Sequence, residues 1–279
     1  LQLTKNTILG AHSPDSVDAF LFYALAAGKM DCGGIEFVHH LNDIESLNEA
    51  ALTGKFEVTA VSIHAYAYLA DRYALLNSGA SMGEGYGPVL VARDSMSSDS
   101  LEEKVVAIPG EKTSALLALR LHSPGVTTRV IRFDEIIPAV ITGKVDAGLV
   151  IHEGQLFYGR EGLKKVLDLG EWWRGETGLP LPLGGNVVRR DLGPEQVGKI
   201  AALIRESIGY ALDHREEALE YALEFGRGLT PEEGDEFVGM YVNDRTLDYG
   251  EEGRKAVQMF LDRGFDAGLV PQRVEAEFI

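Results

Sequence analysis

Apolar positions along the first two thirds of the chain occur in short blocks, separated by segments with three- and four-residue apolar spacing. The blocks predict strands at residues 7–11, 35–39, 58–63, 73–76, 88–92, 104–108, 127–133, 147–151 and 163–169. The spacing predicts helices at 19–26, 44–51, 113–121 and 135–141, with Asp43 and Asp134 as capping residues of the second and fourth. Because strands alternate with helices, we expect mostly parallel sheets with helices on both faces.

The last third of the chain has a helical pattern. Pro194 fits the first position of a helix in which apolar residues recur from Val197 to Ala211. Thr230, followed by Pro231 and Glu233, has the spacing of a capping box, and residues 250–265 form a last amphipathic helix.

A repeated phrase indicates two similar units. Thr53-Gly54-Lys55 and Thr142-Gly143-Lys144 each follow a predicted helix and precede an apolar strand, beyond which lie His64 and His152. We therefore expect an α/β fold with two lobes and a cleft between them, the layout of type II periplasmic-binding-protein-like folds. Residues 1–92 plus 189–279 are expected to form lobe one and residues 93–188 lobe two, with chain crossings near 78–93 and 179–190. The C-terminal helices should pack mainly on lobe one.

Composition narrows the class of partner. Asp and Glu number 43 against 26 Lys and Arg, a formal net charge of −17, which argues against nucleic acid or an anionic membrane surface as partner. Cys32 is the only cysteine, so no internal disulfide can form. No stretch approaches the roughly 20 apolar residues of a membrane span, and residues 1–6 lack a charged segment leading into an apolar one. We expect a cytoplasmic protein, although a signal peptide already removed would leave no trace in this chain. The oligomeric state stays open.

His152 is the strongest candidate for chemistry. It comes directly after a buried strand, where open α/β sheets place groups that face a ligand. With an ordinary pKa near 6.5, a histidine there can act as a general base. The alternative is a histidine that only binds a backbone carbonyl. Glu153 is a candidate to orient the ring. In the first copy, Ser62 either donates to a ligand or caps the next helix, which is the commoner role.

Two loops that precede helices resemble anion cradles. They are residues 13–16 and 109–114, where hydroxyl groups and amide groups at a helix start would face the cleft. A carboxylate ligand would suit such a site, although ordinary helix capping explains the same residues. No phosphate-binding loop, dinucleotide fingerprint or nucleophile elbow occurs, and we expect no cofactor. We also expect no metal, because a single cysteine cannot form a thiolate cluster and the adjacent His39 and His40 would point to opposite faces of a strand. Trp172-Trp173 either lines the cleft or is buried at the boundary between the lobes.

Segments distributed nearly end to end carry a more specific similarity. They are residues 43–48, 65–68, 71–79, 85–88, 148–153, 168–173, 177–184 and 241–243, in this order. With them the chain resembles the 1,4-dihydroxy-6-naphthoate synthase family of the futalosine route to menaquinone. The resemblance implies a cofactor-independent lyase with a small carboxylate substrate. It assigns the catalytic base to His152 and substrate contacts to Ala60, Val61, Ser62, Thr113 and Ser114, and Ser13 and Asp18 of the first loop complete the expected set.

The first loop departs from the family pattern. The family usually reads Ser-Pro-Cys-Pro-Asn-Asp, where this chain has Asp15 for the cysteine and Val17 for the asparagine. Recognition of the substrate therefore differs if that asparagine contacts it. Two alternatives stay open. One is the chorismate dehydratase of the same pathway, and the other is a non-catalytic solute-binding protein for a small carboxylate.

Overall fold

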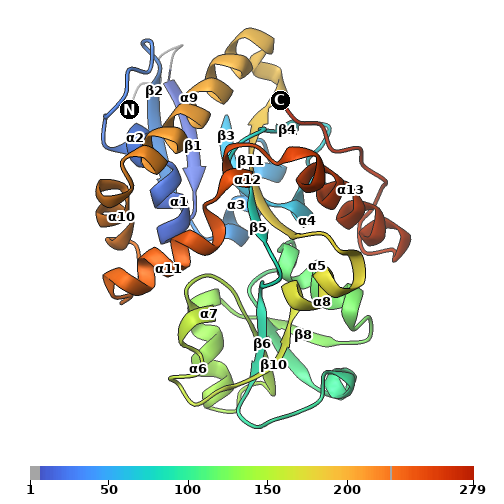
Figure 1. The fold of residues 1–279 in the computed structure, drawn as a ribbon. Helices are drawn as coiled ribbons and strands as arrows, with labels where there is room; N and C mark the ends of the chain where they lie inside the picture. The colour runs from blue at the N-terminus through green and yellow to red at the C-terminus, as the bar shows by residue number, and fades with distance from the viewer. Residues whose placement is uncertain (1–6, 227) are drawn as a thin grey trace.

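A computed structural model describes residues 7–226 and 228–279 of the chain (Figure 1). Residues 1–6, on which the expectation about a leader segment rested, lie outside the described residues.

Two sheets organise the molecule (Figure 1). The first has six strands in the order β2-β1-β3-β11-β4, with β5 added to β11: β1 (Thr7–His12), β2 (Glu36–Leu41), β3 (Val58–Ser62), β4 (Tyr73–Leu75), β5 (Ser81–Gly83) and β11 (Leu181–Arg189). The second has five strands in the order β10-β6-β9-β7-β8: β6 (Val89–Ala92), β7 (Val105–Ile108), β8 (Thr127–Val130), β9 (Ala147–Val150) and β10 (Lys164–Asp168). We call the units built on the first and second sheets lobe one and lobe two.

Helices cover both sheets. They are α1 (Ser16–Leu21), α2 (Tyr23–Ala26), α3 (Ile44–Leu52), α4 (Ile63–Tyr66), α5 (Ser114–His122), α6 (Ile136–Ile141), α7 (Gly154–Phe157), α8 (Leu169–Thr177), α9 (Pro194–Asp213), α10 (Arg215–Leu223), α11 (Pro231–Tyr241), α12 (Asp244–Leu247) and α13 (Gly250–Asp266). Short 3₁₀ turns are η1 (Ser98–Glu103), η2 (Phe133–Glu135) and η3 (Arg190–Leu192). The predicted capping box at Thr230 and the helical start at Pro194 are confirmed.

The two lobes share one topology. In lobe one, β2, β1 and β3 are parallel and β11 and β4 follow antiparallel; in lobe two, β8, β7 and β9 are parallel and β6 and β10 follow antiparallel. The repeated phrase therefore marks equivalent strands, β3 and β9. The expectation of mostly parallel sheets is wrong, because both sheets are mixed. Strands β11 and β6, which arrive from the other lobe, add antiparallel to the parallel strands.

Sheet membership places these crossing strands differently from the expected boundaries. Strand β6 hydrogen-bonds to β9 and β10 of lobe two, whereas the expected boundary after residue 92 put it in lobe one. Strand β11 hydrogen-bonds to β3 and β4 of lobe one, whereas residues 181–188 were expected in lobe two. A crossing strand carries the apolar pattern of a strand in either lobe, so its partners cannot be read from the pattern.

The helix cap expected at Asp134 is absent. Asp134 lies in the turn η2, and α6 begins after Glu135 without a side-chain cap. The carboxylate of Asp134 pairs with Arg132 two residues earlier.

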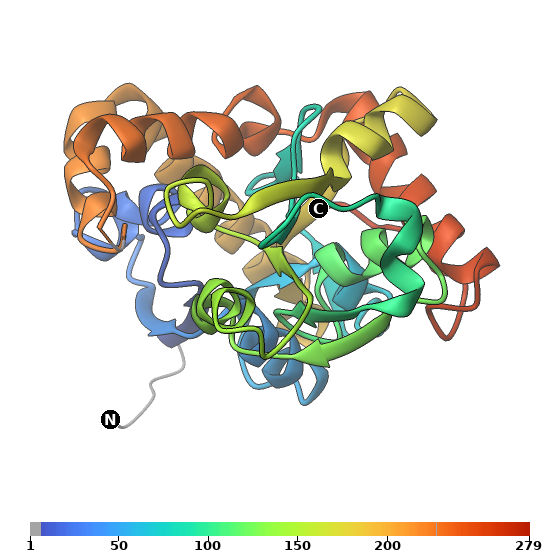
Figure 2. The same cartoon turned by 90° about the horizontal axis from the view of Figure 1, so that it is seen from below.

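The C-terminal helices lie on lobe one. Helices α9, α10 and α11 pack against α1 and α2, and Figure 2 shows this group (orange) beside the N-terminal segment (blue). Helix α13 packs on β11 and α4, and it also reaches α5 of lobe two. Trp173 of α8 is fully buried and packs edge-on against Phe260 of α13, with ring centres 5.2 Å apart. Of the two readings of the Trp pair, burial at the boundary is therefore confirmed for Trp173.

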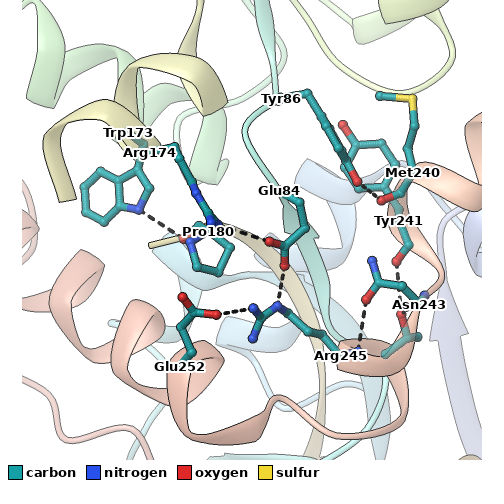
Figure 3. Close-up of polar contacts among 11 residues, drawn as sticks. Glu84, Tyr86, Trp173, Arg174, Pro180, Met240, Tyr241, Asn243, Arg245 and Glu252 are labelled. Carbon is teal, nitrogen blue, oxygen red and sulfur yellow. Dashed lines mark hydrogen bonds and ion pairs between the residues drawn. The ribbon is translucent and has the colours of Figure 1, made fainter. Parts of the chain in front are cut away.

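Charged groups span the crossing between the lobes (Figure 3). Glu84, which follows β5, accepts from Arg174 of α8 at 3.3 Å and from Arg245 of α12, and Arg245 also pairs with Glu252 of α13. The backbone here is tightly packed, since a Cβ on Gly170 would lie 2.0 Å from the carbonyl of Tyr86. This contact holds the first turn of α8 directly on the crossing segment.

Two histidines are buried in the fold. His12, at the end of β1, is 3% exposed and stacks on Phe22, and His64 of α4 is 4% exposed. Burial lowers the pKa of each to about 4, and nearby His39 adds to the effect at His12. Both rings are therefore neutral in the folded protein at neutral pH.

We expect stability to fall as the pH is lowered from about 6.5, the ordinary pKa of histidine, toward 4. In this window the unfolded chain binds protons that the folded chain does not, so the stability present above the window is lost within it. At pH 5 each histidine would cost about 2 kcal/mol. Urea unfolding at neutral pH and at pH 5 measures the decline. His64→Asn, which keeps a donor toward the carbonyl of Thr113, should remove about half of the histidine contribution. An unchanged decline in this variant would contradict the assignment.

Candidate functional site

A cavity lies between the lobes at the strand ends. Its empty volume is about 800 Å³, part of which is open to solvent. The residues predicted to form the site all line it: Ser13, Asp18, Ala60, Val61, Ser62, Thr113, Ser114 and His152. They come from the ends of β1, β3 and β9 and from the start of α5, so the cleft lies where parallel α/β strands end. Their individual roles stay predictions.

His152 follows β9 with an unusual backbone. Its φ of 55° is the only positive value at a non-glycine among the described residues, a conformation that costs roughly 1–2 kcal/mol for an L-residue. Nδ1 lies 3.3 Å from Oδ2 of Asp15, the ring packs edge-on against Phe133, and Nε2 is buried with no hydrogen-bond partner. Within the described chain neither ring nitrogen meets a backbone carbonyl, and Nδ1 faces the carboxylate of Asp15 instead.

The first loop is not an anion cradle. Asp15 caps α1 itself, because Oδ1 accepts the amides of Val17 and Asp18, both at 2.9 Å. The amide of Ser13 donates to Oδ2 of Asp18 at 2.7 Å. The amides are thus already bound by carboxylates of the chain. Burial and the neighbouring charge of Asp15 raise the pKa of Asp18 well above its ordinary value, so the surroundings of Asp18 disfavour a further negative charge.

In the second loop, residues 109–114, backbone amides at the start of α5 could bind a ligand, whereas the hydroxyl groups are already hydrogen-bonded within the protein. Thr113 Oγ donates to the carbonyl of Gly110 and accepts from the amide of Leu116. Ser114 Oγ donates to the carbonyl of Leu183 at 2.6 Å and accepts from the amide of His64 at 3.1 Å. Both hydroxyls are therefore engaged in the protein, contrary to expectation. The first amides of α5, on Ser114 and Ala115, have no carbonyl within the helix, and both residues line the cavity.

Ser62 keeps a hydrogen to donate. Asn48 is fully buried and binds Ser62 twice, accepting from its amide at 2.9 Å and donating to its Oγ at 3.2 Å. Ser62 precedes α4 but makes no side-chain cap, so the commoner reading of this residue is wrong. Because Oγ accepts from Asn48, its own proton is directed elsewhere. His64 lies in α4 and lines neither of the two cavities described here.

Sequence reasoning missed several polar residues of the cavity wall, among them Gln155, Asn186 and Tyr241. Asn186 of β11 is 2% exposed, and its Nδ2 has no partner among the described residues. A lone amide in an otherwise apolar strand was the available signal. Tyr241 of α11 donates to Gln155 of α7 at 2.8 Å, which joins the two lobes beside the cavity. No local pattern indicates that contact, because its partners lie in different lobes.

A second cavity adjoins the first. Its empty volume is about 1010 Å³ and its wall includes His152, which thus stands between the two cavities, together with Asp134, Glu153 and Glu161. Glu153, the residue expected to orient the ring, is itself buried, and Asp15 is the carboxylate beside Nδ1. In residues 7–226 and 228–279 no group of three or more His, Cys, Asp or Glu side chains is placed to hold a metal ion. The helices described in those ranges include none long and apolar enough to cross a membrane.

Solved structures with a similar fold differ widely in sequence identity to this chain. A protein of Archaeoglobus fulgidus is 45% identical and superposes with a TM-score of 0.92, over 96% of this chain and 100% of that one. The alkanesulfonate-binding protein of Xanthomonas axonopodis pv. citri, solved with bound MOPS, is 13% identical with a TM-score of 0.72, over 98% of this chain and 97% of that one. The second similarity concerns the fold alone and confirms the two-lobed binding-protein-like architecture.

Curated relatives are more informative about the family. Proteins named 1,4-dihydroxy-6-naphthoate synthase from Thermus thermophilus and Streptomyces coelicolor are 44% and 38% identical to this chain. The alignments cover 92% and 96% of this chain, and 93% and 96% of the relatives. The family model described as menaquinone biosynthesis matches residues 9–266. This chain therefore belongs to the menaquinone biosynthesis family.

Proposed function

We propose that this protein is a 1,4-dihydroxy-6-naphthoate synthase that cleaves cyclic dehypoxanthinyl futalosine, with His152 as the general base. The observation that carries the proposal is a histidine at the end of β9, in the wall of the cleft, with Nε2 unpartnered. Family membership supplies the reaction, and the geometry supplies a base of suitable type. An unprotonated imidazole can accept a proton near neutral pH.

The cleft offers the substrate one anion site and two donors. The carboxylate would bind at the amides of Ser114 and Ala115, where the helix start carries partial positive charge. Ser62 Oγ and Asn186 Nδ2 would donate to other oxygens of the substrate. The acidic first loop would discourage the carboxylate from binding in the opposite orientation. A small carboxylate that binds in the cleft thus meets one favourable end and one unfavourable end.

The proposed step is a proton transfer coupled to bond cleavage. Nε2 of His152 takes a proton from a substrate carbon, and the C–H electron pair forms a double bond. The bond between the two ring systems breaks, and the sugar-derived fragment leaves with that bond's electrons. The naphthoate ring becomes aromatic, which drives the reaction. No net oxidation occurs in this step, so it requires no redox partner.

Mass spectrometry of the protein incubated with cyclic dehypoxanthinyl futalosine tests the function. We expect 1,4-dihydroxy-6-naphthoate to appear. A folded protein that binds the compound without converting it would favour the solute-binding alternative. Loss of water from chorismate in a parallel incubation would favour the dehydratase.

His152→Asn tests the base. Asparagine tolerates the left-handed backbone of this position but cannot accept a proton as imidazole does. We expect kcat to fall about 10²- to 10⁴-fold, the usual contribution of a general base, with KM changed little. Steady-state kinetics on the two proteins measure this, and turnover near that of the wild-type protein would rule out the assignment.

Asn186→Leu tests the buried donor of β11. Leucine has a similar branched shape and removes a polar nitrogen that has no partner in the protein, so stability should stay the same or rise by about 1 kcal/mol. Binding of the substrate should weaken about tenfold. Isothermal titration with the naphthoate product and thermal unfolding separate the two effects. A variant that is less stable yet binds normally would show that Asn186 serves the fold and not the site.

A further inference from the structure

We propose that Asp15 is the positioning residue for His152, and that the pair forms across the cleft only while the lobes lie together. This inference rests on the proposed function.

The two oxygens of Asp15 have different partners. Oδ1 is fixed by the amides of Val17 and Asp18, and Oδ2 lies 3.3 Å from Nδ1 of His152. The carboxylate is 5% exposed and the imidazole 16%. The start of α1 therefore holds one oxygen so that the other faces the ring.

His152, the partner of Asp15, is also held in place by its surroundings. His152 has a φ of 55°, in the left-handed region, so its backbone departs from that of an extended strand. The ring packs edge-on against Phe133, with centres 5.0 Å apart. Gly154 packs directly against β9, since a Cβ there would lie 2.6 Å from Val150. A backbone strained at one residue and supported by its surroundings is typical of a functional position.

Asp15 and His152 belong to different lobes, and other contacts hold the lobes together around them. Tyr241 of lobe one donates to Gln155 of lobe two, and Glu233 of lobe one pairs with Arg160 of lobe two. At the far side of the cavity, the amide of Lys112 donates to Glu45 at 3.1 Å. These contacts fix the separation of Asp15 and His152. Opening of the lobes would part them.

The pair gives His152 one tautomer and stabilises its charged form. A carboxylate at Nδ1 holds the proton on that nitrogen, which leaves the lone pair of Nε2 for the substrate. After Nε2 has accepted the proton, the imidazolium faces the charge of Asp15. Because the partners meet only in the closed arrangement, the base is oriented when the substrate is enclosed.

Asp15→Asn tests the pair, and Asp168→Asn is its matched control. Asparagine still caps a helix, so α1 keeps its start. Asp168 caps α8 in the same way, accepting the amides of Gly170 and Glu171, and it lies outside both cavities. We expect kcat of Asp15→Asn to fall about 10²- to 10⁴-fold with KM changed by less than about threefold, since orientation of a base acts on the chemical step. The control should keep the wild-type kcat.

The pH profile separates positioning from a structural role. The ionisable groups that share cavity walls with His152 are Asp15, Asp18, Asp134, Glu153, Glu161 and Tyr241. Because a carboxylate beside an imidazole stabilises its charged form, removing the charge of Asp15 alone should move the midpoint of the rise in kcat/KM to lower pH. A variant with the wild-type kcat and midpoint would overturn the proposal. Should Asp15→Asn not fold, Asp15→Ser offers a second capping residue without the carboxylate, with the same expectations.

Nitrogen-15 NMR of His152 tests the pair without relying on turnover. In wild-type protein saturated with 1,4-dihydroxy-6-naphthoate, we expect the shifts of an imidazole protonated at Nδ1, and in Asp15→Asn a mixture of tautomers. Identical shifts in the two proteins would refute the pairing. An inactive wild-type protein that shows the Nδ1 tautomer would refute the proposed function and leave the pair in place.

Discussion

Strands β6 and β11 each leave one lobe and add to the sheet of the other, and the geometry of the cleft depends on where they hold the two sheets. Strand β11 lies between β3 and β4 of lobe one, and β6 lies between β9 and β10 of lobe two. Each crossing strand is thus a central member of the sheet that it enters, hydrogen-bonded on both sides. A change in the angle between the lobes must therefore be absorbed in the short segments before these strands, at residues 84–88 and 178–180, where Glu84 and the Gly170–Tyr86 contact lie.

The net charge of −17 describes the surface and not the site. An anionic substrate needs only local partial charges, and the amides at the start of α5 supply them inside an acidic protein. The carboxylates at the cleft are each bound within the chain: Asp15 by two amides and Asp18 by one. Hydrogen bonds within a few ångströms therefore set the electrostatic potential at this site. The more distant charges on the surface contribute little, because salt largely screens them.

The sequence predicted what depends on local chemistry. Strand and helix positions follow from apolar spacing, and the capping box at Thr230 follows from side-chain type. The residues at strand ends that line the cavity could be named because topology alone brings such ends together. The sheet to which β6 belongs could not be named, because a strand's apolar pattern does not identify its neighbours. Nor could the contact between Asp15 and His152, because it depends on how one lobe lies on the other. Ser114 shows a third limit: its hydroxyl faces Leu183 and not the ligand, which only packing decides.

The shared topology of the lobes makes their chemical difference informative. The loops after β1 and β7 occupy equivalent positions in the two lobes. Each leads into the next helix of the chain, α1 after β1 and α5 after β7. After β7 the hydroxyl of Thr113 caps α5 by accepting the amide of Leu116 alone, so the amides of Ser114 and Ala115 at the cleft have no carbonyl within the helix. After β1 the helix is six residues long and is capped by a carboxylate of its own, so the loop offers negative charge in place of amides. In the proposed site, one shared topology would thus supply an anion site from one lobe and a carboxylate for the histidine of the other. Opposed polarity at the two ends of one cleft would orient the proposed carboxylate substrate, and it requires no more than the placement of aspartate at one of two equivalent caps.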